Sequence, residues 1–499
     1  MAEEDAGSFA HSGTALIRNK WLGYAGVAAI VVLGAVLRFH ALGRKSVWVD
    51  EGVSIELARL DWYNFLRILW RHEGNMALYH LFLRFWLHLG SSETWIRALS
   101  VLFGLGTLPA VYALGRRLFT VRAGLVASVL LAVNAYQIRY SQEARSYSLY
   151  SLLCVLSSLY FVKTLEDPSR RNRIGHVVSS ALAVYAHFFA GLLMVSQWIS
   201  LRLPGYDEVK KATQKSWQLF AIAISPEVLF VLTTGTGVLR WIPRPGFKDL
   251  KYLALFLTGN GGVPLAGLYL LAIVLGLLST RRYQEDRTWN WSYSFLLLWL
   301  LFPIVFVFLV SQIKPFFLPR YFVFTLPALT LLAAAGLERL RYSWLITIVL
   351  AVFVLLSAKG VAGYYQRDID IAREDWRSAT RFIMERAQPG DAVIFHQPIG
   401  RMPYEYYKSI DPHTTDLQVL YPEHGDKLTF RDFYAGPASR AFLSSVPGVR
   451  ARVWVVFTYN EINSAPDATT TFVTDVFGQR YKSVHREQFA GIEVRLYSR

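Results

Sequence analysis

GRKSVWVDEG, residues Gly43–Gly52, places two adjacent carboxylates directly after the first long apolar segment of the chain. Acidic side chains are costly at a membrane boundary unless they have a partner or a function. Asp50 and Glu51 therefore suggest general-base chemistry or metal binding at the mouth of a membrane protein. Taken alone, the Asp-Glu pair is equally compatible with a solvated turn that caps a helix.

The composition is that of a polytopic membrane protein with some water-soluble mass. Of the 499 residues, 53% are hydrophobic and 18% are charged, and the net charge is +16. In a membrane protein this charge has two ordinary sources, basic cytoplasmic loops and a basic surface that faces phosphate groups, so no nucleic-acid partner is expected. The single cysteine, Cys154, excludes an intramolecular disulfide and a multi-cysteine metal site.

Apolar segments recur along the chain up to residue 358 and predict about eleven transmembrane helices. They lie at 21–40, 98–115, 123–138, 146–162, 174–187, 188–203, 217–235, 264–280, 291–311, 321–338 and 343–358. Lysine and arginine concentrate in alternate loops, which predicts a cytoplasmic N-terminus and places residues 41–97 and 359–499 outside the cytoplasm. The acidic segment 1–20 is expected to be a cytoplasmic tail and not a signal peptide.

These patterns predict an α-helical membrane domain over 21–358, with a first outer loop at 41–97 and a soluble extracytoplasmic α/β domain over 359–499. In the loop, residues 54–70 and 77–90 have helical periodicity and are expected to form amphipathic helices in the membrane interface. The second of them carries His80, Arg84 and His88 four residues apart, which we interpret as exposed side chains and not as metal ligands.

The C-terminal segment has the signals of mixed α/β structure. Residues 374–391 predict a helix that ends before Pro389-Gly390. Residues 392–397 and 452–460 have the composition of strands, and 480–489 with 492–498 predict a hairpin around Ala490-Gly491.

Polar side chains gather in three segments that are predicted to share the outer face. The first pairs Asp50 and Glu51 with Arg71, His72 and Glu73; the second carries Arg139, Glu143, Arg145 and Tyr147; the third carries Lys314, Arg320 and Tyr321. Cations beside apolar helices suit a lipid-linked phosphate. Nearby carboxylates suit an acceptor hydroxyl or a divalent metal. Any one of these residues could simply anchor a span end, but three such segments on one face indicate a site.

The motifs WVDEG, IRALSVLFGLGTLPAVYALGRRLF, YSQEARSYSLY and PFFLPRYFVFTLPALTLLAAAGLERL resemble bacterial family-39-like glycosyltransferases of the GT-C class. These are relatives of protein O-mannosyltransferases and of aminoarabinose transferases that act on lipid A. The resemblance spans about residues 20–360. It implies a multi-pass enzyme of the cell membrane, a hexosyl- or pentosyltransferase.

Such an enzyme would make an inverting transfer from a polyprenyl-phosphate sugar to a protein, lipid or glycan acceptor on the extracytoplasmic face. By the same resemblance Asp50 matches the catalytic aspartate, and Glu51 would shape the site. The implied donor-phosphate ligands are Arg139, Arg145, Lys314 and Arg320.

Two departures from the family pattern affect the accessory residues. A PPLYY segment of many members stands here as NMALYH, Asn75–His80, which weakens the transfer of roles to Arg71, His72 and Glu73. The first loop also has no Asp-x-Asp motif, so a metal site like that of oligosaccharyltransferases is not supported, and a divalent metal cofactor is left unassigned.

Three other functions remain as alternatives. One is a related transferase that moves another lipid-linked, phosphate-bearing group. A transporter or lipid flippase is the second, although the chain shows no repeated halves and no charge pairs within its apolar segments. The third is a non-catalytic scaffold whose soluble domain recruits partners.

Overall fold

The computed structural model describes residues 23–203, 207–234, 242–282, 287–367, 373–411, 417–422, 428–433, 435–462 and 465–499. The expected cytoplasmic tail, 1–20, lies outside these ranges. The chain divides into two compact units. Unit 1 comprises Met1–His40, Gly74–Tyr79 and Arg97–Gln366, and unit 2 comprises Ala41–Glu73, His80–Ile96 and Arg367–Arg499. Most of the first outer loop therefore groups with the C-terminal segment.

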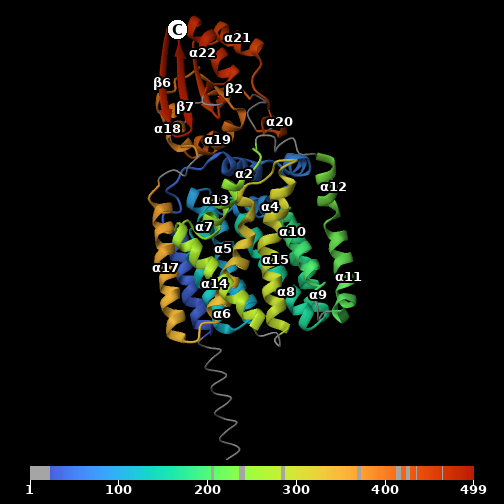
Figure 1. The fold of residues 1–499 in the computed structure, drawn as a ribbon. Helices are drawn as coiled ribbons and strands as arrows, with labels where there is room; N and C mark the ends of the chain where they lie inside the picture. Colours follow the sequence, from blue (N-terminus) through green and yellow to red (C-terminus); the bar gives the residue numbers. More distant parts are fainter. Residues whose placement is uncertain are drawn as a thin grey trace, which may run out of the picture. The chain divides into compact units, whose positions relative to one another are not determined.

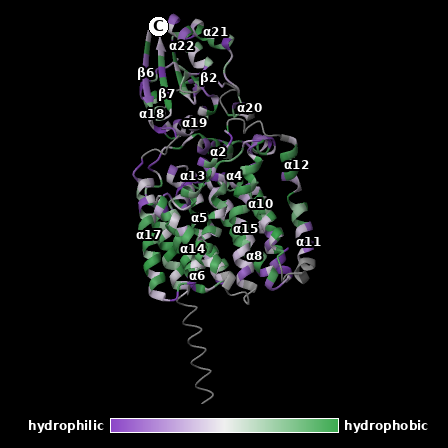
Figure 2. Ribbon diagram, viewed as in Figure 1, coloured by the Kyte–Doolittle hydropathy of each residue, from purple (hydrophilic) through white to green (hydrophobic). Residues whose placement is uncertain are grey.

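Unit 1 is built of helices (Figure 1). Hydrophobic residues dominate α6, α14 and α17 (Figure 2). The described helices that lie wholly or mostly in this unit are Gly23–Phe39, α5 (Glu93–Leu118), α6 (Val121–Ala132), α7 (Ala135–Ser141), α8 (Tyr147–Glu166), α9 (Arg170–Ala186), α10 (Ala190–Ser200), α11 (Asp207–Ala223), α12 (Ser225–Thr234), α13 (Phe247–Leu257), α14 (Val263–Arg282), α15 (Arg287–Val310), η4 (Pro319–Thr325), α16 (Leu326–Leu337) and α17 (Ser343–Tyr365).

Five helical segments are long and apolar enough to cross a membrane, and the number rises to seven if each of two bent helix pairs counts as one span. The five are Glu93–Leu118, Tyr147–Glu166, Trp289–Val310, Pro319–Leu337 and Ser343–Tyr365. The predicted polytopic helical architecture is thus confirmed, whereas the count of eleven spans stays a prediction. Helix α17 continues to Tyr365, so the domain boundary expected at residue 358 falls within a helix.

The bend of 66° between α6 and α7 has a local cause in two buried polar side chains. Asn134 caps α7, because its Oδ1 accepts the N–H groups of Tyr136 and Gln137, both at 3.0 Å. Arg38 donates to the carbonyl of Ala132 at 3.1 Å and so satisfies the end of α6. Helix ends inside an apolar body need such partners. The break starts a new helix that carries Arg139.

Unit 2 contains a five-stranded mixed sheet of order β2-β1-β3-β7-β6 (Figure 1). Strand β1 is parallel to β2 and β3, and β7 is antiparallel to β3 and β6. The described strands are β1 (Ala392–His396), β2 (Gln418–Tyr421), β3 (Arg452–Thr458), β4 (Glu461–Ile462), β5 (Ala465–Pro466), β6 (Ser483–Phe489) and β7 (Ile492–Ser498).

The expected hairpin is confirmed, since Phe489 pairs with Ile492 across the turn Ala490-Gly491. Gly491 has φ +68°, a left-handed conformation that glycine adopts without steric cost. Described helices accompany the sheet: α18 (Trp376–Arg386), η5 (Pro398–Gly400), α19 (Arg401–Ile410), α20 (Phe430–Phe433), α21 (Arg440–Val449) and α22 (Ala468–Arg480). Buried apolar residues of β1, β3, α21 and α22 form a common core, which confirms a small α/β domain.

The first outer loop departs from the sequence prediction in two places. The single helix expected over 54–70 is wrong, because the chain breaks after α2 (Val49–Arg59), and Asp61 caps α3 (Trp62–Ile68) by accepting the Asn64 N–H at 3.0 Å. The loop continues through η1 (Leu69–Glu73), η2 (Gly74–Met76) and α4 (Ala77–Trp86), which confirms the second helix. His80 is fully buried, so the prediction of an exposed histidine row is wrong there; Leu83, three residues on, is buried on the same face.

Candidate active site

Asp50 and Glu51 occupy the first turn of α2 in unit 2, where the positive end of the helix dipole favours carboxylates. Glu51 is buried at 1% exposure and Asp50 is half-buried. Helix α2 packs closely on α19. A Cβ added to Gly52 would lie 2.6 Å from the backbone nitrogen of Pro403, so only glycine permits this approach. The helix that carries the carboxylate pair is therefore tied to the C-terminal part of the chain.

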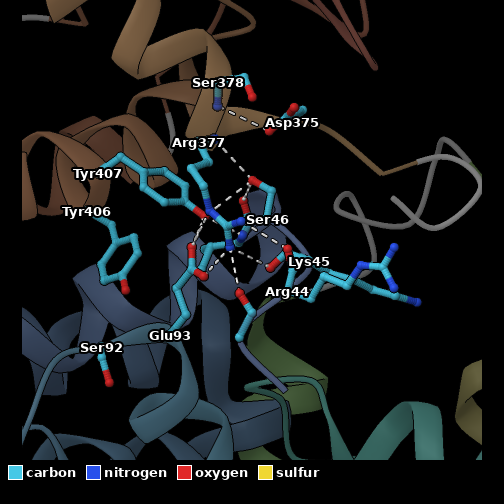
Figure 3. A network of polar contacts seen from close by, with 12 residues as sticks. Arg44, Lys45, Ser46, Ser92, Glu93, Asp375, Arg377, Ser378, Tyr406 and Tyr407 are labelled. Atoms are coloured by element: carbon cyan, nitrogen blue, oxygen red, sulfur yellow. Dashed lines mark hydrogen bonds and ion pairs between the residues drawn. The ribbon is translucent and has the colours of Figure 1, made fainter. Parts of the chain in front are cut away.

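A dense polar network holds the turn at residues 43–47 that leads into α2 (Figure 3). The guanidinium of Arg377, on α18, donates to the carbonyls of Gly43 at 2.8 Å and Arg44 at 2.9 Å. It also forms an ion pair with Glu93, the first residue of α5. The Tyr407 hydroxyl accepts the Val47 N–H at 2.7 Å and donates to Glu93. Backbone groups from residue 43 to residue 47 are thus fixed by side chains of α18 and α19.

The expected accessory residues Arg71, His72 and Glu73 lie together in η1, also in unit 2. Arg71 is exposed, while His72 and Glu73 are half-buried. Partial burial lowers the pKa of His72, and the charge of Arg71 lowers it further. His72 is therefore a neutral imidazole around pH 7, a form that can accept or donate a hydrogen bond.

Unit 1 brings together two of the four predicted phosphate ligands. Arg145, only 8% exposed, and Arg320 both act electrostatically on the buried His187, which lies between α9 and α10. The two expected tyrosines border the same histidine: the Tyr321 ring lies 5.0 Å from the imidazole and the Tyr147 ring 6.2 Å from it. We call Arg145, His187 and Arg320 the arginine–histidine cluster.

His187 is oriented by the turn in which it lies. Its Nδ1 accepts the Phe189 N–H at 3.3 Å, so the proton of the neutral ring resides on Nε2. Asn75 holds the next residue, since its Oδ1 accepts the Phe188 N–H at 3.0 Å. Among the described residues, Nε2 has no hydrogen-bond partner, and it is buried. A buried donor beside two guanidinium groups is a suitable contact for an anionic oxygen.

The other two predicted cations differ from the cluster. Arg139 pairs with Glu143 one helical turn away, with an Nε–Oε1 distance of 3.4 Å. Lys314 is exposed in the turn that follows α15. Glu143 therefore neutralises Arg139. Of the four predicted phosphate ligands, the structure brings Arg145 and Arg320 together.

Sequence reasoning missed His187 and Tyr150, whose ring stacks on the imidazole at 4.9 Å and 21°. The available signal was a histidine in YAHFFAG, at the junction of the apolar segments 174–187 and 188–203. Within the described ranges, no three His, Cys, Asp or Glu side chains are grouped so as to hold a metal ion. The carboxylate pair belongs to unit 2 and the arginine–histidine cluster to unit 1.

Comparison with known proteins agrees with the expected resemblance. Residues 76–232 match the family model of dolichyl-phosphate-mannose-protein mannosyltransferases. No curated protein sequence matches the chain.

Solved structures match a larger part of the chain than the family model does. ArnT from Cupriavidus metallidurans in the apo state is 13% identical, with a TM-score of 0.64 over 96% of this chain and 98% of ArnT. The same protein bound to undecaprenyl phosphate gives a TM-score of 0.63 at 14% identity, over 94% of this chain and 97% of ArnT.

A more distant match is the oligosaccharyltransferase AglB from Archaeoglobus fulgidus, in complex with an inhibitory peptide and a dolichol-phosphate. It is 11% identical, with a TM-score of 0.50 over 81% of this chain and 62% of AglB. The family match over residues 76–232 supports the resemblance stated from the motifs and indicates a glycosyltransferase, and the solved structures show that the fold is shared with ArnT.

Proposed function

We propose that this protein is an integral-membrane, inverting glycosyltransferase that moves a sugar from a polyprenyl-phosphate donor to an acceptor on the extracytoplasmic face of the cell membrane. The observation that carries the proposal is the arginine–histidine cluster in a helical body with the fold of ArnT, which has been solved with undecaprenyl phosphate bound. The buried Arg145, the half-buried Arg320 and the buried N–H donor of His187 match the charge and the acceptor oxygens of one phosphate.

In this mechanism the acceptor oxygen attacks the anomeric carbon of the donor sugar while the bond from that carbon to the phosphate oxygen breaks. Asp50 takes the proton of the acceptor hydroxyl, and the polyprenyl phosphate leaves as an anion. Arg145 and Arg320 stabilise the negative charge that grows on the leaving phosphate, with the His187 Nε2–H as a neutral third donor. A single displacement inverts the anomeric configuration.

The remaining candidate residues take supporting roles in the proposal. Glu51 shapes the first turn of α2, and Tyr147 and Tyr321 border the cluster as apolar walls with polar tips. Arg139 and Lys314 would contact the donor headgroup more peripherally, because Arg139 already pairs with Glu143. The acceptor would be a protein, lipid or glycan hydroxyl or amine.

The test is incubation of the purified full-length protein with a panel of undecaprenyl-phosphate-linked hexoses and pentoses, with release of undecaprenyl phosphate as the readout. We expect release from at least one donor, and loss of that release in Asp50→Asn. A matched control is Asp249→Asn, an exposed capping carboxylate at the start of α13. If the Asp50→Asn variant releases undecaprenyl phosphate as fast as the wild type, Asp50 has no part in the mechanism.

A further inference from the structure

The C-terminal segment of unit 2 supplies a second carboxylate next to Asp50. Glu374 is buried at 2% exposure, and its Oε2 accepts the Val49 N–H at 3.1 Å. Val49 is the first residue of α2, so Glu374 satisfies one of the unpaired N–H groups that every helix start presents. The group that fixes the first turn of this helix therefore comes from a residue 325 positions further along the chain.

Glu374 is itself held in place by a strained partner. The Tyr459 hydroxyl donates to Glu374 Oε1. Tyr459 has φ +50°, a left-handed backbone conformation that is uncommon for residues other than glycine. Backbone strain of this kind persists only where the surroundings enforce it, and it often accompanies functional sites. Both oxygens of Glu374 are thus engaged, one by the start of α2 and one by Tyr459.

Asp50 is close enough to this pair to act on both residues electrostatically. Burial raises the pKa of Glu374, and the charge of Asp50 raises it further, whereas the Tyr459 and Val49 hydrogen bonds and Arg373 lower it. The negative charge of Asp50 therefore opposes the ionisation of Glu374.

We propose that Glu374 is a positioning residue for Asp50: it anchors the first turn of α2 and places a second carboxylate beside the catalytic one, so that the C-terminal domain completes the carboxylate site. This inference rests on the proposed function, in which Asp50 is the general base. It gives the C-terminal domain a direct role in the chemistry of the first outer loop.

Other charged groups face this pair and set the background for any pH dependence. The Arg373 guanidinium lies over the ring of Trp48 and interacts with Glu374 and Tyr459. Farther along α2, Glu56 and Arg59 form a separate charged cluster with Arg401 and Glu405 of α19. Glu51 follows Asp50 in the same turn. Arg373 lowers the pKa of Glu374, opposite in sign to the effect of Asp50 on the same carboxylate.

The test uses two substitutions of opposite charge effect in the full-length protein. Glu374→Gln keeps a carbonyl oxygen for the Val49 N–H but removes the negative charge, whereas Arg373→Gln removes the positive charge. The readout is the pH profile of kcat/KM for release of undecaprenyl phosphate from the donor found active in the panel. The rate falls at low pH as the base is protonated.

We expect the acidic limb to move to lower pH in Glu374→Gln, because the variant lacks the like charge that Glu374 carries once it is ionised. In Arg373→Gln the limb should move to higher pH. A purely structural role would lower the rate of both variants without moving the limbs in opposite directions. Glu385→Gln, an exposed carboxylate on α18, is the matched control and should keep the wild-type profile.

The outcomes separate this inference from the proposed function. If Asp50→Asn retains wild-type release, the general base is misassigned, and both the proposed mechanism and the role of Glu374 are overturned. If Asp50→Asn abolishes release while Glu374→Gln is folded and has the wild-type profile, only the role of Glu374 is overturned. Should Glu374→Gln fail to fold, the Arg373→Gln profile decides, and an unmoved acidic limb there overturns the inference.

Discussion

Arg377→Ala should destabilise unit 2 more than any exposed charge substitution in the described part of that unit. The lost contacts are the ion pair with Glu93 and hydrogen bonds to the carbonyls of Gly43, Arg44 and Lys45 at 2.8, 2.9 and 3.3 Å (Figure 3). Removal of one charged hydrogen-bond partner costs about 1.5–3 kcal/mol where the other partner stays buried.

The expected loss is smaller than the sum of these contacts. The Arg377 side chain is 32% exposed and that of Glu93 is 12% exposed, so water replaces part of what is lost. We therefore expect Arg377→Ala to lower the free energy of unfolding by about 2–4 kcal/mol, and Arg377→Lys by about 1–2 kcal/mol, since lysine keeps the charge but not the planar fork. Transfer should fall as well, because residues 43–47 lead directly to Asp50.

The assay is denaturant unfolding of the purified protein in detergent, with limited proteolysis to report on unit 2. Arg386→Ala is the control, since its side chain is 49% exposed, pairs with the adjacent Glu385 at 3.3 Å and lies over the Phe382 ring of the same helix. A double-mutant cycle of Arg377→Ala with Glu93→Gln should give a coupling energy of about 1–3 kcal/mol. The reasoning is refuted if Arg377→Ala unfolds like wild type or if the cycle shows no coupling.

Four further predictions address catalysis, topology, donor binding and pH. Asp50→Asn should lower transfer by about a hundred- to ten-thousand-fold while donor binding, measured by titration with undecaprenyl phosphate, is retained. A cysteine in place of the exposed Ser444 on α21, with Cys154→Ala, should react with an impermeant maleimide in intact cells; reaction only after lysis would contradict the predicted topology. Arg320→Lys should weaken donor binding and Arg320→Ala should weaken it about ten- to a hundredfold, because lysine lacks the fork; a wild-type titration for Arg320→Lys would leave Arg320 as an interface anchor. Burial raises the pKa of Glu56 to about 7. The protonated side chain therefore contributes to the free energy of unfolding below the pKa of the unfolded state, and this contribution is lost as the pH rises through about 7. In Glu56→Gln the free energy of unfolding, measured between about pH 5 and pH 8, should no longer show this loss.

Local signals in the sequence predicted local structure well. The hairpin around Ala490-Gly491 and the helix that ends before Pro389 are both present, because turn and stop residues act on their immediate neighbours. The break at Leu60-Asp61 was missed, since helical periodicity continues across it and only the cap of Asp61 on Asn64 reveals the new helix. The apolar pattern likewise located helices without fixing how many of them cross the membrane.

The candidate site was predictable only in part, for a related reason. Arg145 and Arg320 were named from their places at span ends, but their convergence on His187 depends on contacts between distant segments. Nothing near His187 in the sequence marks it as a partner of residue 320. The link between Val47 and Tyr407 spans 360 positions, and that between Val49 and Glu374 spans 325. Such pairs have no signature in a single sequence.

These long-range contacts bear on how the C-terminal segment should be regarded. If it were a recruitment module attached to a complete enzyme, its side chains would bond mainly among themselves. Instead Glu374, Arg377 and Tyr407 bond to backbone groups of residues 43–49, and Gly52 has no side chain where Pro403 approaches. A truncation before Glu374 would leave these backbone groups without the partners that the fold gives them, in the very segment that ends at Asp50. The C-terminal domain is therefore part of the structure that presents the carboxylate pair, and the first outer loop and this domain are best treated as one functional element.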